Sequence, residues 1–162
     1  NRECMELWGV DERTLWAAAR KNLEREVFQI ETMESVIKNV LAEMADEKAA
    51  KQFADGMEGT EMEGIGRVYV ITNPCRKYAA RAMLRRDLLQ KLAKELGGSF
   101  YILPCSVHEI LFMEESSVVT EENLKNMVYT VNHCSGAVEP EEWLSDSLYY
   151  YNEDKDRVVL VA

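Results

Sequence analysis

The fold of this chain is decided between Gly66 and Met113, by GRVYVITNPCRKYAARAMLRRDLLQKLAKELGGSFYILPCSVHEILFM. Three runs within it are dense in β-branched and aromatic residues, which predicts strands. These runs lie at residues 67–72, 99–103 and 110–113. Asn73-Pro74 follows the first run and Pro104 the second, and proline ends strands because it has no amide hydrogen to donate. The segment between the first two strands is the ambiguous part.

Residues 78–97 fit either one long helix or two elements. In one helix, leucines recur every four residues, but Arg81 and Arg85 would then point into the apolar face. Splitting the segment removes this conflict. We therefore predict an extended strand at 79–84, followed by a helix at 88–97 with Asp87 as its N-cap.

The flanking sequence predicts further helices. Asp11, Thr32 and Thr120 are good N-cap residues, and apolar residues recur at helical spacing after each. The predicted elements are helices at 12–25, from 33 onward and at 121–133, an extended link at 27–30, an acidic loop at 55–61 expected to be disordered, a turn opened by Pro140, and a hairpin of 148–151 with 157–161.

Together these elements predict an α+β fold: a mostly antiparallel sheet of about five or six short strands with helices packed on it. We expect residues 1–57 to form an N-terminal helical segment, part of a longer protein because no initiating Met opens the chain. Residues 66–162 would form the α+β core domain. The two parts are expected to make a single structural unit.

Charge and composition exclude several classes of protein. The net charge is −10, which argues against nucleic acid as a partner. Residues 67–94 carry eight Lys or Arg and one acid, a balance of +7, so the other residues sum to −17. No apolar run reaches the ~20 residues that cross a membrane. Four widely spaced cysteines, read as reduced and at least partly buried, predict a cytoplasmic protein.

The polar segment Pro104-Cys105-Ser106-Val107-His108-Glu109 has two interpretations. Cys105, His108 and Glu109 are the residue types of a thiol nucleophile, its base and an orienting group. The pattern Ser106-x-x-Glu109 is also a helix capping box, and we favour this structural role. A zinc site that adds His133 and Cys134 lacks the usual ligand spacing, so no metal is predicted.

Other polar residues extend the set of candidates. After the first strand, Asn73 and Arg76 offer an anion site, although a plain turn is the simpler interpretation. Asp146 offers a polar pocket, although a turn with local hydrogen bonds explains it more simply. The catalytic candidates are therefore His108, Glu109 and Ser106, and the ligand-binding candidates are Asn73, Arg76 and Asp146. No cofactor is predicted, and Trp8, Trp16 and Trp143 are expected to pack in the core or at its edge.

The segment at 104–109 resembles the Pro-Ser-Ser-x-His-Glu signature of an uncharacterised bacterial family, a domain of unknown function. The resemblance to that family extends to residues 5–10, 70–73 with Arg76, 82 and 84, 100–103, 140–142 and 144–146, so it spans most of the chain. Cys105 stands where the signature has serine, so the family's chemistry would not require a sulfur there. The resemblance implies the fold but no activity, substrate or cofactor.

Two main functional hypotheses follow. The first is a non-catalytic cytosolic interaction or ligand-sensing module, with an unknown protein or small molecule as its partner and an undetermined oligomeric state. The alternative is a hydrolase- or transferase-like enzyme with His108 as general base and Glu109 or Asp146 as its orienting group. A purely structural domain of a larger assembly is a third. The position of His108 relative to Asn73, Arg76 and Asp146 discriminates between the first two.

Overall fold

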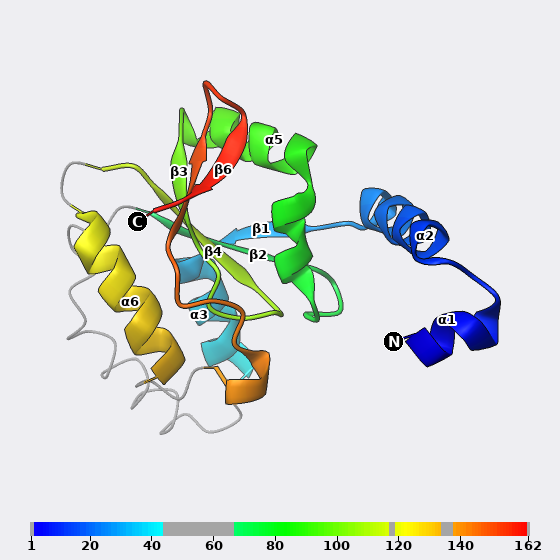
Figure 1. The fold of residues 1–162 in the computed structure, drawn as a ribbon. Coiled ribbons are helices and arrows are strands. Elements are labelled where there is room, and N and C mark those ends of the chain that lie inside the picture. The colour runs from blue at the N-terminus through cyan, green and yellow to red at the C-terminus, as the bar shows by residue number, and fades with distance from the viewer. Residues whose placement is uncertain (1, 44–66, 117–118, 134–137, 162) are drawn as a thin grey trace.

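A computed structural model describes residues 2–43, 67–116, 119–133 and 138–161. Within these residues the fold is α+β, as the sequence predicts, with a six-stranded antiparallel sheet in the order β1-β2-β4-β3-β5-β6 (Figure 1). The strands are β1 (Gln29–Thr32), β2 (Val68–Thr72), β3 (Phe100–Leu103), β4 (Ile110–Glu114), β5 (Tyr149–Asn152) and β6 (Arg157–Leu160). The helices are α1 (Arg2–Trp8), α2 (Glu12–Arg25), α3 (Met33–Glu43), α5 (Arg86–Leu96) and α6 (Glu121–His133), with 3-10 turns η1 (Ala79–Leu84) and η2 (Pro140–Glu142).

The core lies on both faces of the sheet. Alternate residues of β3 point to opposite faces, so all four of its residues are buried. Phe100 belongs to a cluster with η1 and α5, where its ring stacks on Tyr151 at a centroid distance of 5.0 Å. Tyr101 belongs to a second cluster with Leu124 and Val128 of α6. Helices therefore cover both faces and leave the strand ends to carry polar residues.

The strand predicted at 79–84 is wrong, because this segment is the 3-10 helix η1. Three residues per turn place Ala79 and Ala82 on the buried side and Arg81 and Leu84 on the exposed side. The backbone N–H groups of Ala79 and Ala80 also bond to carbonyls of the 104–109 segment, which an extended strand in a sheet would not need. The predicted strand would have buried Leu84 with Ala80 and Ala82, whereas Leu84 is 72% exposed in the 3-10 helix.

The break before α5 is confirmed, but the predicted cap is wrong. The helix begins at Arg86, and Asp87 lies in its first turn, where it pairs with Arg85. Gly97 ends the helix in a left-handed conformation, with φ of 83°, as the Gly97-Gly98 pair predicts.

The N-terminal segment contributes β1, which the sequence analysis assigned to an extended link. β1 pairs with β2 and places Ile30 opposite Ile71, so residues before position 57 belong to the sheet. Upstream, α2 is confirmed, with Asp11 accepting a 2.7 Å hydrogen bond from the Thr14 amide. Figure 1 shows α1 and α2 extending away from the sheet as an arm.

The prediction that Trp8 and Trp16 pack in the core or at its edge is wrong. Trp8 is 61% exposed and Trp16 is 57% exposed, and α2 contains no buried residue. The amphipathic pattern of α2 therefore forms a helix whose apolar face has no cover among the described residues. The acidic loop predicted at 55–61 and Cys134 lie outside the described residues. No helix in the described part of the chain is long and apolar enough to cross a membrane.

Asp156 links the β5–β6 hairpin to α5, and it makes the fold acid-sensitive. Its carboxylate pairs with Arg86 and accepts a 2.6 Å hydrogen bond from the buried Tyr151 hydroxyl, which holds the pKa of Asp156 at about 2. An unfolded aspartate has a pKa of about 3.9. A carboxyl group whose pKa is lower when folded stabilises the fold above the unfolded pKa and loses this contribution as the pH falls.

We therefore expect Asp156→Asn to flatten the decline in stability between about pH 4 and pH 2. Urea unfolding of both proteins across that range measures the effect. Equal pH slopes for the two proteins would contradict the role of this carboxylate.

Candidate functional site

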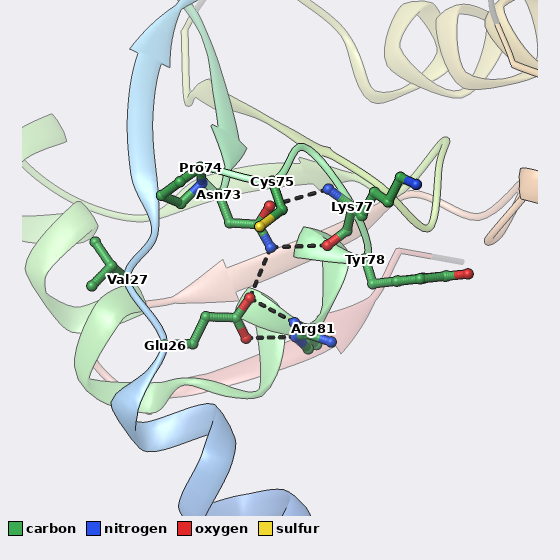
Figure 2. Close-up of a pocket in the computed structure, with 8 residues that line it drawn as sticks. All are labelled: Glu26, Val27, Asn73, Pro74, Cys75, Lys77, Tyr78 and Arg81. Carbon is green, nitrogen blue, oxygen red and sulfur yellow. Dashed lines mark hydrogen bonds and ion pairs between the residues drawn. The ribbon is translucent and has the colours of Figure 1, made fainter.

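A recess of about 330 Å³ lies where the end of β2 meets the chain that leaves α2 (Figure 2). Glu26 and Val27 come from the connection between α2 and β1, whereas the other residues come from the turn after β2 and from η1. The lining residues are Glu26, Val27, Asn73, Pro74, Cys75, Lys77, Tyr78 and Arg81. The recess therefore lies between the arm and the body of the protein, and one predicted ligand-binding candidate, Asn73, lines it.

Asn73 is buried and holds the turn together. Its Oδ1 accepts a 3.1 Å hydrogen bond from the Lys77 amide, and its Nδ2 donates at 2.8 Å to the Lys77 carbonyl. The second Nδ2 hydrogen points to Glu26 Oε1, also at 2.8 Å, as Figure 2 shows. Because both amide hydrogens and the carbonyl are engaged, Asn73 shapes the recess and has no hydrogen left to donate to a ligand.

Glu26 is the second polar centre of the recess. Arg81 donates to both of its carboxylate oxygens, at 2.6 and 2.7 Å, in a bidentate pair. These hydrogen bonds, with that from Asn73, lower the pKa of Glu26. The carboxylate is therefore ionised and already neutralised within the protein. The sequence signal for this pair is weak, because 55 residues separate its two members.

The open parts of the recess are apolar or cationic. Val27 is 66% exposed and Tyr78 is 59% exposed, and Pro74 and Cys75 are exposed beside them. Exposure of Cys75 corrects the prediction that the cysteines are at least partly buried. Since the polar atoms of Asn73 and Glu26 are paired internally, the recess suits an apolar group better than a small polar ligand.

Arg76 is not part of the lining. It is exposed, with a left-handed φ of 49°, and its amide bonds to the Asn73 carbonyl at 2.8 Å to close the turn. Asn73 and Arg76 therefore share a turn, but Arg76 makes no side-chain hydrogen bond or ion pair with another described residue.

A second recess of about 530 Å³ lies between α2 and η1. Its lining is Trp16, Ala19, Arg20, Leu23, Glu24, Arg81, Leu84 and Arg85. Arg85 donates to the carbonyls of Leu23 and Glu24 at 2.8 and 3.1 Å, which satisfies the C-terminal end of α2 and fixes it against η1. Leu84, which projects from η1 on the other side of this recess, is 72% exposed.

The two recesses form one surface. A further recess, lined by Ala19, Asn22, Leu23, Glu26 and Arg81, shares residues with both of them. We call this surface the arm groove and define it by its apolar residues, Trp16, Leu23, Val27, Tyr78 and Leu84. The arm groove was not predicted from the sequence, because the amphipathic pattern of residues 12–25 and Trp16 were expected to be packed.

His108, the predicted general base, is bonded through both ring nitrogens. The Tyr78 amide donates to Nδ1 at 3.1 Å, and Nε2 lies 3.1 Å from Glu142 Oε1. The ring also contacts that of Tyr78 at a centroid distance of 5.1 Å. An Nδ1 that accepts from a backbone N–H leaves the hydrogen on Nε2, directed at the carboxylate. Neither nitrogen is left free to accept a proton from a substrate.

This geometry predicts that the neutral His108 ring is the Nε2–H tautomer. Long-range proton–nitrogen NMR correlations measure the two ring nitrogens separately. We expect Nδ1 to resonate as an unprotonated nitrogen that accepts a hydrogen bond, and Nε2 as a protonated nitrogen. An Nδ1–H tautomer would contradict the bond from Tyr78 and reopen the ring for acid–base chemistry.

The capping box predicted at Ser106-x-x-Glu109 is wrong. Ser106 Oγ accepts from the His108 amide at 3.0 Å, which makes a local turn, and the next element is the strand β4. The Ser106 backbone forms an isolated β-bridge with Trp143. Glu109 is half-buried, and its side chain has no hydrogen-bond partner within the described ranges. The backbone of the 104–109 segment therefore forms hydrogen bonds with η1 on one side and with the η2 region on the other.

Burial raises the pKa of the Cys105 thiol to about 11, with a further contribution from the charge of Asp146. The thiol is therefore uncharged at neutral pH and is not prepared as a nucleophile or metal ligand. No cluster of three metal-ligating residues occurs in the part of the chain that the structure describes.

Asp146 lies with His133 and Asn132 and has no hydrogen bond to His108. Its carboxylate is 3.1 Å from His133 Nε2 and accepts from Asn132 Nδ2 at 2.6 Å, and these bonds, that of Asn132 first, lower the pKa of Asp146. The His133 ring is held edge-on by Trp143, at a centroid distance of 4.4 Å. The predicted candidates thus fall into three groups: Asn73 and Arg76 in the turn, Ser106, His108 and Glu109 in the 104–109 segment, and Asp146 beside His133. Tyr78 links the first two groups through its bond to His108.

Comparison of the chain with models of protein families gives one match. A family model described as a family of unknown function (DUF5688) matches residues 1–153. No curated protein and no solved structure matches the chain.

Proposed function

This chain belongs to the family of unknown function DUF5688, and from its geometry we propose that it is a non-catalytic protein-interaction module. The arm groove is its docking surface, and the occupant is a segment of a partner protein. The Pro-Ser-Ser-x-His-Glu resemblance, the bacterial origin that it implies and a cytoplasmic location belong to this proposal. The exposed free thiol of Cys75 is consistent with a reducing compartment.

The observation that carries the proposal is the apolar face of α2, which stays exposed among the residues that the structure describes. A single amphipathic helix of 14 residues is marginally stable in water and normally buries its apolar face against other elements. Here the face of α2 points across a groove to the exposed Leu84. Contiguous exposed apolar residues with a polar rim are typical of protein interaction sites.

The internal pairing of the polar atoms explains why a protein segment is favoured over a small polar ligand. Asn73 and Glu26 bond to each other and to their neighbours, so they maintain the shape of the groove without offering a hydrogen bond to its occupant. The occupant must then gain affinity from apolar contacts, which requires an extended or helical segment rather than a compact polar molecule.

The alternative, an enzyme with His108 as general base, has less support. His108 is engaged through both nitrogens, and its predicted partner Asp146 pairs with His133 instead. The proposal of an interaction module therefore assigns no catalytic role to His108, Glu109 or Ser106.

A randomised peptide-display library, selected against the whole purified chain, tests the proposal. The matched variant is Trp16→Ala with Leu84→Ala, which removes two exposed side chains from opposite walls of the groove. We expect selected peptides to bind the wild-type protein at least about tenfold more tightly than this variant, because buried aromatic anchors dominate interface energies.

Leu160→Ala is the control, since Leu160 is 59% exposed but lies on β6 and does not line the arm groove. It should bind the peptides as the wild type does. Circular dichroism and thermal unfolding establish that all the variants fold. A library that yields no binder, or peptides that bind the groove variant as tightly as the wild type, would overturn the proposal.

A further inference from the structure

The charges around the arm groove identify the class of segment that it binds. Resting on the proposed function, we infer that the partner segment is acidic and amphipathic, with apolar anchor residues flanked by Asp or Glu. The recesses that open on Val27 and on Trp16 would each hold one apolar anchor.

Three cations lie beside the groove. Arg20 lines the recess of Trp16, Lys77 lines that of Val27, and Arg76 is the neighbour of Lys77 in the exposed turn. None of the three forms an ion pair with a residue in the described ranges, whereas Arg81 and Arg85 are neutralised by Glu26 and Asp87. An occupant would therefore meet three positive charges that no ion pair with a described residue neutralises.

The acids nearby offset these cations only in part. Glu26 lies under Asn73 and Arg81 with both oxygens engaged, so it presents no free charge to an occupant. Glu24, the other acid in the lining, is the single exposed anion of the two main recesses. The local field at the groove is therefore positive, although the chain carries −10 overall.

Charge also excludes two other occupants. Two copies of the chain that docked groove to groove would place Arg20, Arg76 and Lys77 against like charges, which disfavours a symmetric dimer through this surface. A nucleic acid would meet the positive rim, but the apolar residues of the groove and the net charge of −10 oppose it. An acidic protein segment with apolar anchors complements both the positive charges at the rim of the groove and the apolar residues at its centre.

Three synthetic peptides with the same pattern of Leu and Phe, and with Glu, Gln or Lys at the remaining positions, test this inference. Fluorescence anisotropy of each labelled peptide with the whole chain gives the dissociation constants. We expect the Glu peptide to bind at least about tenfold more tightly than the Gln peptide, since each exposed charge pair contributes a few-fold at most. The Lys peptide should bind more weakly than the Gln peptide.

Charge-reversal variants locate the effect. Arg20→Glu and Lys77→Glu should each weaken binding of the Glu peptide by about two- to fivefold, and raising the salt from about 0.05 to about 0.5 M should reduce the preference for Glu over Gln. Lys94→Glu makes the same change of charge on α5 outside the groove lining and is the control.

The outcomes separate this inference from the proposed function. The Glu and Gln peptides could bind equally well to the wild type and both lose binding to the Trp16→Ala Leu84→Ala variant. This result would overturn the inference of an acidic partner and would still support the arm groove as a docking surface. Binding that the groove variant retains, or no binding by any of the three peptides, would count against the docking groove itself.

Discussion

Replacing Phe112 with alanine is expected to lower the free energy of unfolding by about 3–5 kcal/mol. Phe112 lies on the central strand β4, is fully buried, and packs its ring edge against Phe100 at a centroid distance of 5.5 Å. The same cluster contains residues of η1 and α5, so the cavity left by the ring cannot be filled by a surface side chain.

Guanidinium unfolding followed by tryptophan fluorescence and circular dichroism measures this loss. Leu160→Ala removes an apolar side chain that is 59% exposed, and it should change stability by no more than about 0.5 kcal/mol. A loss below about 1.5 kcal/mol for Phe112→Ala would mean that the face of the sheet covered by η1 and α5 is less tightly packed than the structure requires.

The second large effect is expected at Asn73. Asn73→Ala removes three hydrogen bonds from a buried position and leaves Glu26 without its amide donor, so we expect a loss of about 2–3 kcal/mol. The arm should respond more strongly than the sheet, because Glu26 connects the turn to the chain that leaves α2. A helix the length of α2 is marginal once its contacts are weakened.

Hydrogen–deuterium exchange measures this local effect. In Asn73→Ala the amides of α2 should exchange faster than in the wild type. The amides of β3 and β4 should exchange faster only to the extent that the free energy of global unfolding falls. Asn126→Ala, an exposed change on α6, is the matched control and should leave both unchanged. Uniformly faster exchange throughout the chain would show that Asn73 supports the whole fold rather than the arm.

Where local chemistry decides the structure, the sequence predicts it. Strands β2, β3 and β4 are dense in β-branched and aromatic residues, and the predicted N-caps Asp11, Thr32 and Thr120 accept amide hydrogen bonds as expected. Each of these signals lies within a few residues of the element that it specifies, so no tertiary contact is needed to recognise it.

The incorrect predictions concern segments whose structure depends on distant partners. β1 reads Gln-Ile-Glu-Thr, a half-exposed edge strand, and it is extended because β2 supplies its hydrogen bonds. In η1, the Ala79 and Ala80 amides bond to the carbonyls of His108 and Val107, which lie far away in the sequence, and these bonds favour a 3-10 helix over the predicted strand. The pattern Ser106-x-x-Glu109 predicts a cap only where a helix follows, and here a strand follows.

The candidate site also contains features that the local sequence predicts and features that depend on distant partners. Asn73 is predicted because it follows a strand, but its partners Glu26 and Arg81 are assembled by the pairing of β1 with β2 and by η1. An amphipathic pattern establishes that α2 has an apolar face, but it cannot say whether the protein covers that face. Exposure of Trp16 and Leu84 is therefore information that only the tertiary structure provides.

We propose that the arm groove binds an acidic segment of a partner protein through apolar anchor residues. The most direct test is a titration of the isotope-labelled chain with the Glu peptide, followed by NMR. The account predicts the largest shift changes at the Trp16 indole N–H and the Leu84 methyl groups, with smaller changes at Ala19 and Lys77. Shift changes concentrated around His133 and Asp146, or absent from Trp16 and Leu84, would contradict it.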